Sequence, residues 1–139
     1  MLQQLYPQVQ HTYRFELNKD FQFAAAHFIP HPSAGACANV HGHTYFCNLT
    51  VAGNELDVTN FLVNFGDLKK LVHKRFDHTL INEVEKRVHH PSTEAMAELI
   101  WTIVQDHLDT LPHKPKCLQV FLRETPTSYV VYRPDNSQF

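Results

Sequence analysis

The spacing of apolar residues changes twice along the chain, and this order constrains the fold more than any other feature. From Thr12 to His27 apolar residues alternate with others, which predicts a strand with one buried face, interrupted near Asn18–Asp20. A loop rich in proline and glycine follows over 28–40, and a second alternating strand ends at Gly53–Asn54. The alternating apolar positions are Tyr13, Phe15, Leu17, Phe21, Phe23 and Ala25, then Tyr45, Cys47, Leu49 and Val51.

The middle of the chain has helical spacing. A first helix is predicted over 65–76, with Asn64 as its N-cap and Asp67 in its first turn. A second helix is predicted over 93–108, where Ser92 can cap the start and an acidic residue suits the positive end of the helix. The expected inward positions are Phe65, Leu68, Leu71, Val72 and Phe76, then Met96, Leu99, Ile100, Ile103 and Val104.

Two further strands are expected near the C-terminus. The first places Leu118, Val120 and Leu122 on one face, and the last is centred on 129–132 after a tight connection over 124–128. The order is therefore ββααββ. Grouped strands and helices of this kind predict an α+β fold, with two helices on one face of a four-stranded antiparallel sheet. Nothing divides the chain, so residues 1–139 are expected to form a single domain.

Composition excludes several classes of protein. Apolar residues make up 43% and charged residues 19%, with a net charge of -2, so no broad basic surface for nucleic acid is expected. No apolar run is long enough to cross a membrane, and the first ten residues are too polar for a secretory signal. A cytoplasmic location is therefore expected. The three cysteines do not suggest a disulfide framework, and a special cysteine is more plausibly a metal ligand or a reactive thiol.

The sequence His41-Gly42-His43 is the first specific chemical signal. Residues two apart in a strand point to the same side, so both imidazoles face one point, and His27 lies in the same phase at the end of the first strand. If the two strands are neighbours, three imidazoles meet, and three histidines with an open fourth position describe a catalytic zinc site. The alternative is a chance pair in a chain with 11 histidines. The metallohydrolase pattern HxHxDH is absent, because Thr44, Tyr45 and Phe46 follow His43.

Cys37 precedes His41 by four residues in the loop that leads to this cluster. It could be a fourth ligand, which would make the zinc structural, or a thiolate base with a pKa lowered by the metal and a histidine. Cys47 and Cys117 lie within strand patterns and are expected to be inert core residues.

Three acidic or basic residues outside the histidine cluster also suggest chemistry. Asp77-His78 follows the first helix and is either a proton-transfer pair or a helix C-cap beside a surface histidine. Glu124 continues the phase of Val120 and Leu122, so it is expected on the buried face at a strand end. A carboxylate there needs a partner, either a ligand with N–H donors or a cation such as a neighbouring arginine.

These motifs together resemble the 6-pyruvoyltetrahydropterin synthase / 6-carboxytetrahydropterin synthase family over nearly the whole chain. The resemblance implies the T-fold, in which ββααββ subunits assemble into a barrel-like homo-oligomer, commonly a hexamer, with active sites between subunits. The matching segments are FQFAAAH at 21–27, CANVHGHTY at 37–45, FLVNFGDLKKLV at 61–72, FDHTLIN at 76–82, PSTEAMAELIW at 91–101 and LRET at 122–125.

The resemblance also implies a role for each matching residue. Asp77 and His78 match proton-relay partners of the thiol that a neighbouring subunit supplies, and Glu124 matches the carboxylate that anchors the pterin ring. Ala95-Met96 departs from the asparagine that many relatives carry, which puts a pterin contact from this helix in doubt. The zinc ligands of the family match His27, His41 and His43, and its catalytic thiol matches Cys37. Thr125 lies beside the residue that matches the pterin anchor.

The three-residue gap between Cys37 and His41 resembles the bacterial, carboxy-forming branch of the family. The implied activity is a zinc-dependent lyase that converts 7,8-dihydroneopterin triphosphate into 6-carboxy-5,6,7,8-tetrahydropterin, acetaldehyde and triphosphate, in queuosine and 7-deazaguanine synthesis. The alternatives are the pyruvoyl-forming synthase, a non-catalytic module stapled by zinc, and a metal-storage protein.

Overall fold

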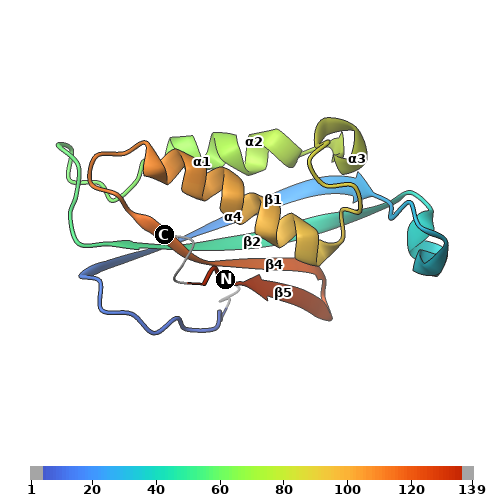
Figure 1. Ribbon diagram of the computed structural model, residues 1–139, viewed down its shortest axis with the longest axis horizontal. Coiled ribbons are helices and arrows are strands. Elements are labelled where there is room, and N and C mark those ends of the chain that lie inside the picture. Colours follow the sequence, from blue (N-terminus) through green and yellow to red (C-terminus); the bar gives the residue numbers. More distant parts are fainter. Residues whose placement is uncertain (1–4, 136–139) are drawn as a thin grey trace.

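The two N-terminal alternating segments form the centre of one mixed sheet in the computed structural model, which describes residues 5–135 (Figure 1). Strand β1 (Phe15–His27) pairs antiparallel with β2 (His41–Gly53) along its whole length. Strand β4 (Lys116–Thr125) pairs with the other edge of β2, and β5 (Ser128–Tyr132) closes that side. The helices cover one face of this sheet (Figure 1). The predicted α+β architecture, with helices on one face, is confirmed.

The sheet differs from the prediction in two respects. It has five strands rather than four, because β3 (Thr79–Leu80) adds a short parallel strand to the end of β1. Strand β1 also runs without a break through Asn18–Asp20. The polar residues there form cross-strand pairs and not a turn: Asn48 Nδ2 donates to Asp20 at 2.9 Å, and Thr50 Oγ1 donates to Asn18 at 3.0 Å.

Two helices begin directly after the N-cap residues that the sequence predicted, Asn64 and Ser92. The Asn64 side chain accepts from the N–H groups of Gly66 and Asp67, and Ser92 Oγ accepts from Ala95 N. The first predicted helix is nevertheless divided at Val72 into α1 (Phe65–Leu71) and α2 (His73–Phe76), and Phe65 is 54% exposed and not inward. The remaining helices are η1 (Pro32–Ala38), a 3₁₀ segment, α3 (Ile81–Val84) and α4 (Thr93–Asp109).

The core lies between the sheet and helices α1, α2 and α4, and α4 is tied to β4 by polar contacts. Trp101 Nε1 donates to Cys117 O at 2.8 Å, and Gln105 Oε1 accepts from Cys117 N at 2.8 Å. A register shift between β2 and β4 makes Cys117, and not Leu118 as predicted, the core-facing partner of Val120. Beyond the shift the predicted phase holds, so Glu124 keeps its expected face.

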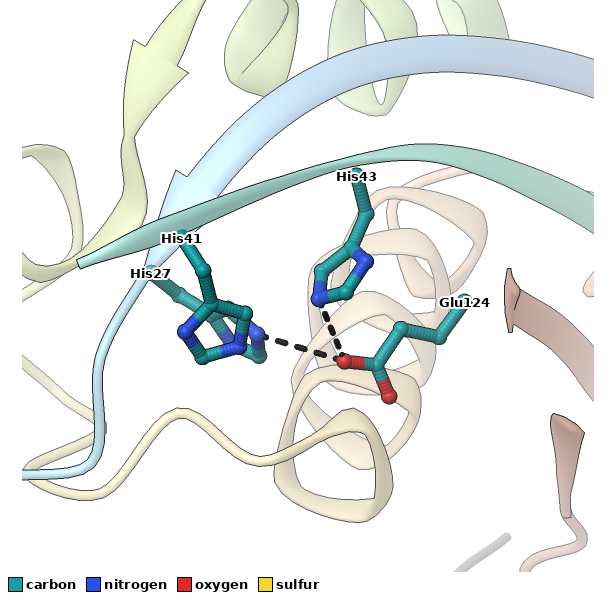
Figure 2. A group of neighbouring side chains, drawn as sticks. All are labelled: His27, His41, His43 and Glu124. Carbon is teal, nitrogen blue, oxygen red and sulfur yellow. Dashed lines mark ion pairs between the residues drawn. The ribbon is translucent and has the colours of Figure 1, made fainter. Parts of the chain in front are cut away.

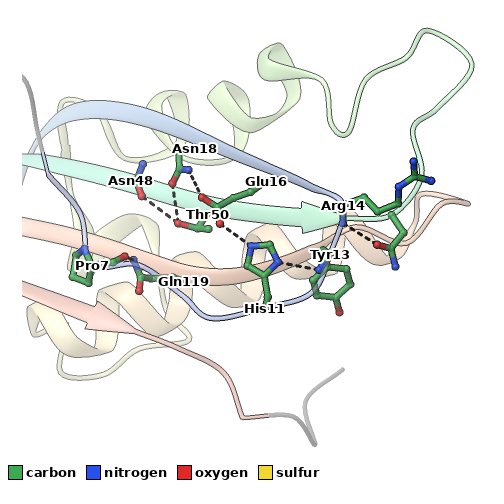
Figure 3. Close-up of polar contacts among 10 residues, drawn as sticks. Pro7, His11, Tyr13, Arg14, Glu16, Asn18, Asn48, Thr50 and Gln119 are labelled. Atoms are coloured by element: carbon green, nitrogen blue, oxygen red, sulfur yellow. Dashed lines mark hydrogen bonds and ion pairs between the residues drawn. The ribbon is translucent and has the colours of Figure 1, made fainter.

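The other face of the sheet is crossed by the chain before β1 (Figures 1 and 3). Gln119 Nε2 donates to Pro7 O at 2.9 Å, and His11 lies 2.8 Å from Glu16 (Figure 3). Polar side chains on this face are therefore satisfied by the N-terminal segment and by one another. Among residues 5–135 no helix has both the length and the apolar character that a membrane span requires.

Candidate active site with a metal centre

Three histidines meet where β1 ends and β2 begins (Figure 2). The strand register places His27 opposite His41 and Ala25 opposite His43, so the phase predicted from the sequence brings all three imidazoles to one side. Their ring centroids lie 4.4, 5.2 and 4.9 Å apart for the pairs 27–41, 27–43 and 41–43. The predicted convergence is therefore confirmed.

Backbone carbonyls orient two of these rings. Nδ1 of His27 lies 2.7 Å from Pro91 O, and Nδ1 of His41 lies 2.8 Å from Asn39 O. A carbonyl oxygen only accepts hydrogen bonds, so each Nδ1 carries the proton and each Nε2 keeps its lone pair. This arrangement is how proteins commonly fix the tautomer and direction of a metal-binding histidine.

The donor atoms form a set that fits a divalent metal ion. The imidazole nitrogens of the three histidines and a carboxylate oxygen of Glu124 all lie within 4.8 Å of one another. The buried Nε2 atoms of His27 and His43 make no hydrogen bond within residues 5–135, and both face the Glu124 carboxylate. Burial lowers the pKa of His43 despite the opposing charge of Glu124, which favours the neutral imidazole that a metal requires. Three histidines with one oxygen donor are typical of zinc.

Glu124 reaches this cluster from the end of β4, on the face that its phase predicted. Its Oε1 lies 2.7 Å from His43 Nε2 and 3.3 Å from His27 Nε2 (Figure 2). Its Oε2 accepts a hydrogen bond from Thr93 Oγ1 at the start of α4. The carboxylate thus faces the three imidazoles, and its partners are histidines and a hydroxyl, not an arginine.

The two neighbouring arginines are engaged elsewhere. Arg123 donates to Pro126 O and stacks over Tyr129 with its guanidinium carbon 4.9 Å from the ring centroid, and Arg133 donates to Gln119. A hollow of about 530 Å³ lies between this strand end and β2, lined in part by His43, Phe46, Glu124 and Thr125. Thr125 therefore lies beside Glu124 in a space that can admit a flat ring.

The three cysteines differ in exposure to solvent. Cys37 lies exposed in η1, and its carbonyl accepts a hydrogen bond from Ile29 N at 2.8 Å. It is not part of the group His27, His41, His43 and Glu124 that could hold a metal ion among residues 5–135. Cys47 and Cys117 are buried, and burial raises the pKa of both thiols, that of Cys117 to about 12. Their predicted location in the core is confirmed.

Asp77 and His78 lie against the outer edge of β1. Asp77 accepts from Ala24 N at 2.8 Å, and His78 N donates to Ala24 O at 2.6 Å. The hydrogen bond from the Ala24 N–H group lowers the pKa of Asp77, and the nearby His78 and His73 lower it further. The Asp77 carboxylate is therefore ionised. His78 Nε2 is 3.4 Å from the carboxylate, while its side chain is 84% exposed. Within residues 5–135 of one chain, no hydrogen bond or ion pair joins this pair to Cys37.

Sequence reasoning missed the groups that support the site. The carbonyls of Pro91 and Asn39 have no sequence signature, because every residue carries one. Thr93 lies at the start of a predicted helix, and its bond to Glu124 could not be read from the helix pattern.

Together the one-sided α+β sheet and the histidine–glutamate cluster define a T-fold protein with a candidate metal centre. The structure of 6-pyruvoyl tetrahydropterin synthase from Caenorhabditis elegans matches with a TM-score of 0.69 at 21% identity, over 87% of this chain and 96% of that one. That from Plasmodium vivax matches with a TM-score of 0.60 at 21% identity, over 87% and 98%. These likenesses confirm the fold.

The sequence comparisons identify the family. The family model described as 6-pyruvoyl tetrahydropterin synthase matches residues 16–135. A 6-carboxy-5,6,7,8-tetrahydropterin synthase from Bacillus subtilis is 62% identical over 96% of this chain and 95% of the relative. One from Synechocystis is 31% identical over 63% and 73%. The chain therefore belongs to the 6-pyruvoyl tetrahydropterin synthase family and is an enzyme of the lyase class.

Proposed function

We propose that this enzyme is a zinc-dependent carbon–carbon lyase that converts 7,8-dihydroneopterin triphosphate into 6-carboxy-5,6,7,8-tetrahydropterin, acetaldehyde and triphosphate. The observation that carries the proposal is the 62% identity to the Bacillus subtilis 6-carboxy-5,6,7,8-tetrahydropterin synthase over 96% of the chain. The product belongs to queuosine and 7-deazaguanine synthesis. The proposal locates the enzyme in the cytoplasm, where its three free thiols would stay reduced.

The metal would be held by Nε2 of His27 and His43 and by a ring nitrogen of His41. When bound, zinc supplies Lewis-acid polarisation of the side-chain oxygens of the substrate, which acidifies the neighbouring C–H and O–H groups. The chain's own contribution to this step is the fixed direction of the rings, which the carbonyls of Pro91 and Asn39 provide.

Glu124 would bind the amino group and ring N–H of the pterin, with Thr125 beside it. Two parallel hydrogen bonds from a planar N–H pair suit a carboxylate, and the negative charge strengthens both. Thr93 holds one oxygen of Glu124, so the carboxylate plane is set before the substrate binds. Glu124 lies next to the histidines, so a pterin ring held by Glu124 would place the side chain of the substrate at the metal.

Cys37 would take up and return protons as a thiolate, coupled to His78 and Asp77. Asp77 is ionised and can stabilise the imidazolium of His78 as it accepts a proton. The exposed positions of Cys37 and His78 support a relay in which the pair comes from a neighbouring copy of the chain. We therefore propose a homohexamer with active sites between subunits.

Product analysis tests this function against its alternatives. Purified protein is incubated with dihydroneopterin triphosphate and zinc, and the products are identified by mass spectrometry, with Cys37→Ala as the control. Carboxytetrahydropterin and acetaldehyde from the parent alone are the expected result. A pyruvoyl product would assign the other branch of the family. No turnover, together with loss of zinc in Cys37→Ala, would make the metal a structural staple.

A further inference from the structure

The end of β1 is held by a side chain that has no part in the chemistry proposed above. Asn82, in α3, accepts from Phe28 N and donates to Phe28 O, both at 3.0 Å. Both residues are half-buried, and only one orientation of the amide satisfies both bonds. Phe28 directly follows the metal ligand His27, so Asn82 pairs the backbone at the point where β1 leaves the sheet.

The backbone bonds continue from this point to the other parts of the site. Ile29 N donates to Cys37 O at 2.8 Å, which closes the loop that carries the thiol. The same loop ends at Asn39, whose carbonyl orients His41. A loop of irregular backbone would otherwise sample many conformations, and these bonds reduce that freedom at both of its ends.

Helix α3 is itself fixed in place, so Asn82 acts from a rigid base. Glu85, directly after α3, is 3% exposed and binds Arg75 of α2 at 2.7 Å and Arg87 at 2.9 Å. Its backbone N–H also donates to Ile81 O at 2.9 Å, at the start of α3. A short helix with such anchors can transmit position to the strand end.

We propose that Asn82 is a positioning residue: its amide clamps the backbone at Phe28 and thereby sets both the direction of His27 and the place of Cys37. The part that concerns His27 follows from the metal centre alone. The part that concerns Cys37 rests on the function proposed above. Neither role requires Asn82 to touch the metal or the substrate.

Two variants of Asn82 and one matched control test the clamp. Asn82→Ala removes both bonds, while Asn82→Asp keeps the acceptor for Phe28 N and loses the donor to Phe28 O. Asn54→Ala is the control, because Asn54 accepts from Arg14 N at 3.0 Å just before the opposite end of β1. The measurements on the whole protein are zinc affinity by chelator competition, the visible spectrum of the cobalt-substituted form, and kcat and KM at saturating zinc.

For Asn82→Ala we expect zinc affinity to fall about 10-fold or more, as for other groups that support metal ligands, with a changed cobalt spectrum. At saturating zinc, kcat should fall while KM stays within about threefold, because Glu124 is untouched. Asn82→Asp should lie between Asn82→Ala and the parent. Asn54→Ala should match the parent in every measurement.

If Asn82→Ala has the zinc affinity and the cobalt spectrum of the parent, the proposal for His27 is overturned. It is also overturned if Asn54→Ala loses as much zinc affinity as Asn82→Ala. Lost zinc affinity with parent-like kcat at saturating zinc would overturn the proposal for Cys37. If Asn82→Ala does not fold, Asn82→Asp decides by the same criteria. A parent without turnover whose Asn82 variants still lose zinc would refute the proposed function and support the clamp on His27.

Discussion

Replacement of Glu85 by glutamine removes a buried carboxylate that anchors α3, and we expect it to destabilise the folded chain. Hydrogen bonds from Arg87 and then Arg75 lower the pKa of Glu85 from its ordinary 4.5 to about 2, against the opposing effect of burial. A shift of this size corresponds to roughly 3 kcal/mol, at about 1.36 kcal/mol per tenfold change in proton affinity. The side chains of Arg75 and Arg87 are 39% and 50% exposed, so solvent screening reduces the expected loss to about 2 kcal/mol.

The sign of the pH dependence follows from the lowered pKa. A carboxyl group with a lowered folded-state pKa stabilises the protein above its unfolded pKa and loses this contribution as pH falls through the folded value. The difference in unfolding free energy between parent and Glu85→Gln should therefore be full at pH 7. It should narrow as the pH falls from about 4.5 toward about 2.

Urea unfolding at pH 7 and near pH 3.5 measures this difference, with the fluorescence of the single tryptophan, Trp101, as the signal. Protomer concentration is held fixed, because assembly changes apparent stability. Glu83→Gln is the matched control, since Glu83 lies exposed in α3, the helix that Glu85 directly follows. A difference below about 0.5 kcal/mol at pH 7, or an equal difference at both pH values, would refute the reasoning.

Three further predictions concern the site. Tyr45→Phe removes a buried hydroxyl without a hydrogen-bond partner among the described residues, so the free energy of unfolding should stay the same or rise by about 1 kcal/mol; a fall would mean that the hydroxyl is bonded. Iodoacetamide should modify Cys37 in the native protein, and Cys47 and Cys117 only after denaturation, as counted by mass spectrometry. Glu124→Gln should retain zinc but raise KM about 10-fold or more, through loss of charge-assisted hydrogen bonds. Loss of zinc in this variant would instead make Glu124 a ligand.

The convergence of the three histidines could be predicted from the sequence because a strand has a fixed side-chain period. His27, His41 and His43 lie in phase on two consecutive strands joined by the loop 28–40, so local rules were sufficient to bring them together. The same rules failed where a distant partner decides the structure. Asn18–Asp20 reads as a break until Asn48 and Thr50 are placed opposite it.

Leu118 is buried but does not share the face of Val120 and Leu122 as predicted, because the register shift that places Cys117 on that face depends on pairing between two strands far apart in sequence. Strand β3 has only two residues, too few for any apolar period to appear. Glu124 kept its predicted face because β4 pairs regularly with β2 from Gln119 to Arg123, although the pairing of β4 with β5 shifts register between Arg123 and Thr125.

Several groups that orient the site come from one segment, residues 77–93, which shows no clear apolar period of its own. This segment bonds the first strand repeatedly, from Asp77 to Ala24, Asn82 to Phe28 and Pro91 to His27. At its end, Thr93 also holds Glu124. The three histidines are therefore close in sequence, while the carbonyl that orients His27 and the amide that bonds Phe28 come from 64 and 54 residues away. A chain ending at residue 60 would contain all three imidazoles but neither the carbonyl of Pro91 nor the clamp of Asn82, so the presence of the ligands is a local property and their geometry a property of the whole fold.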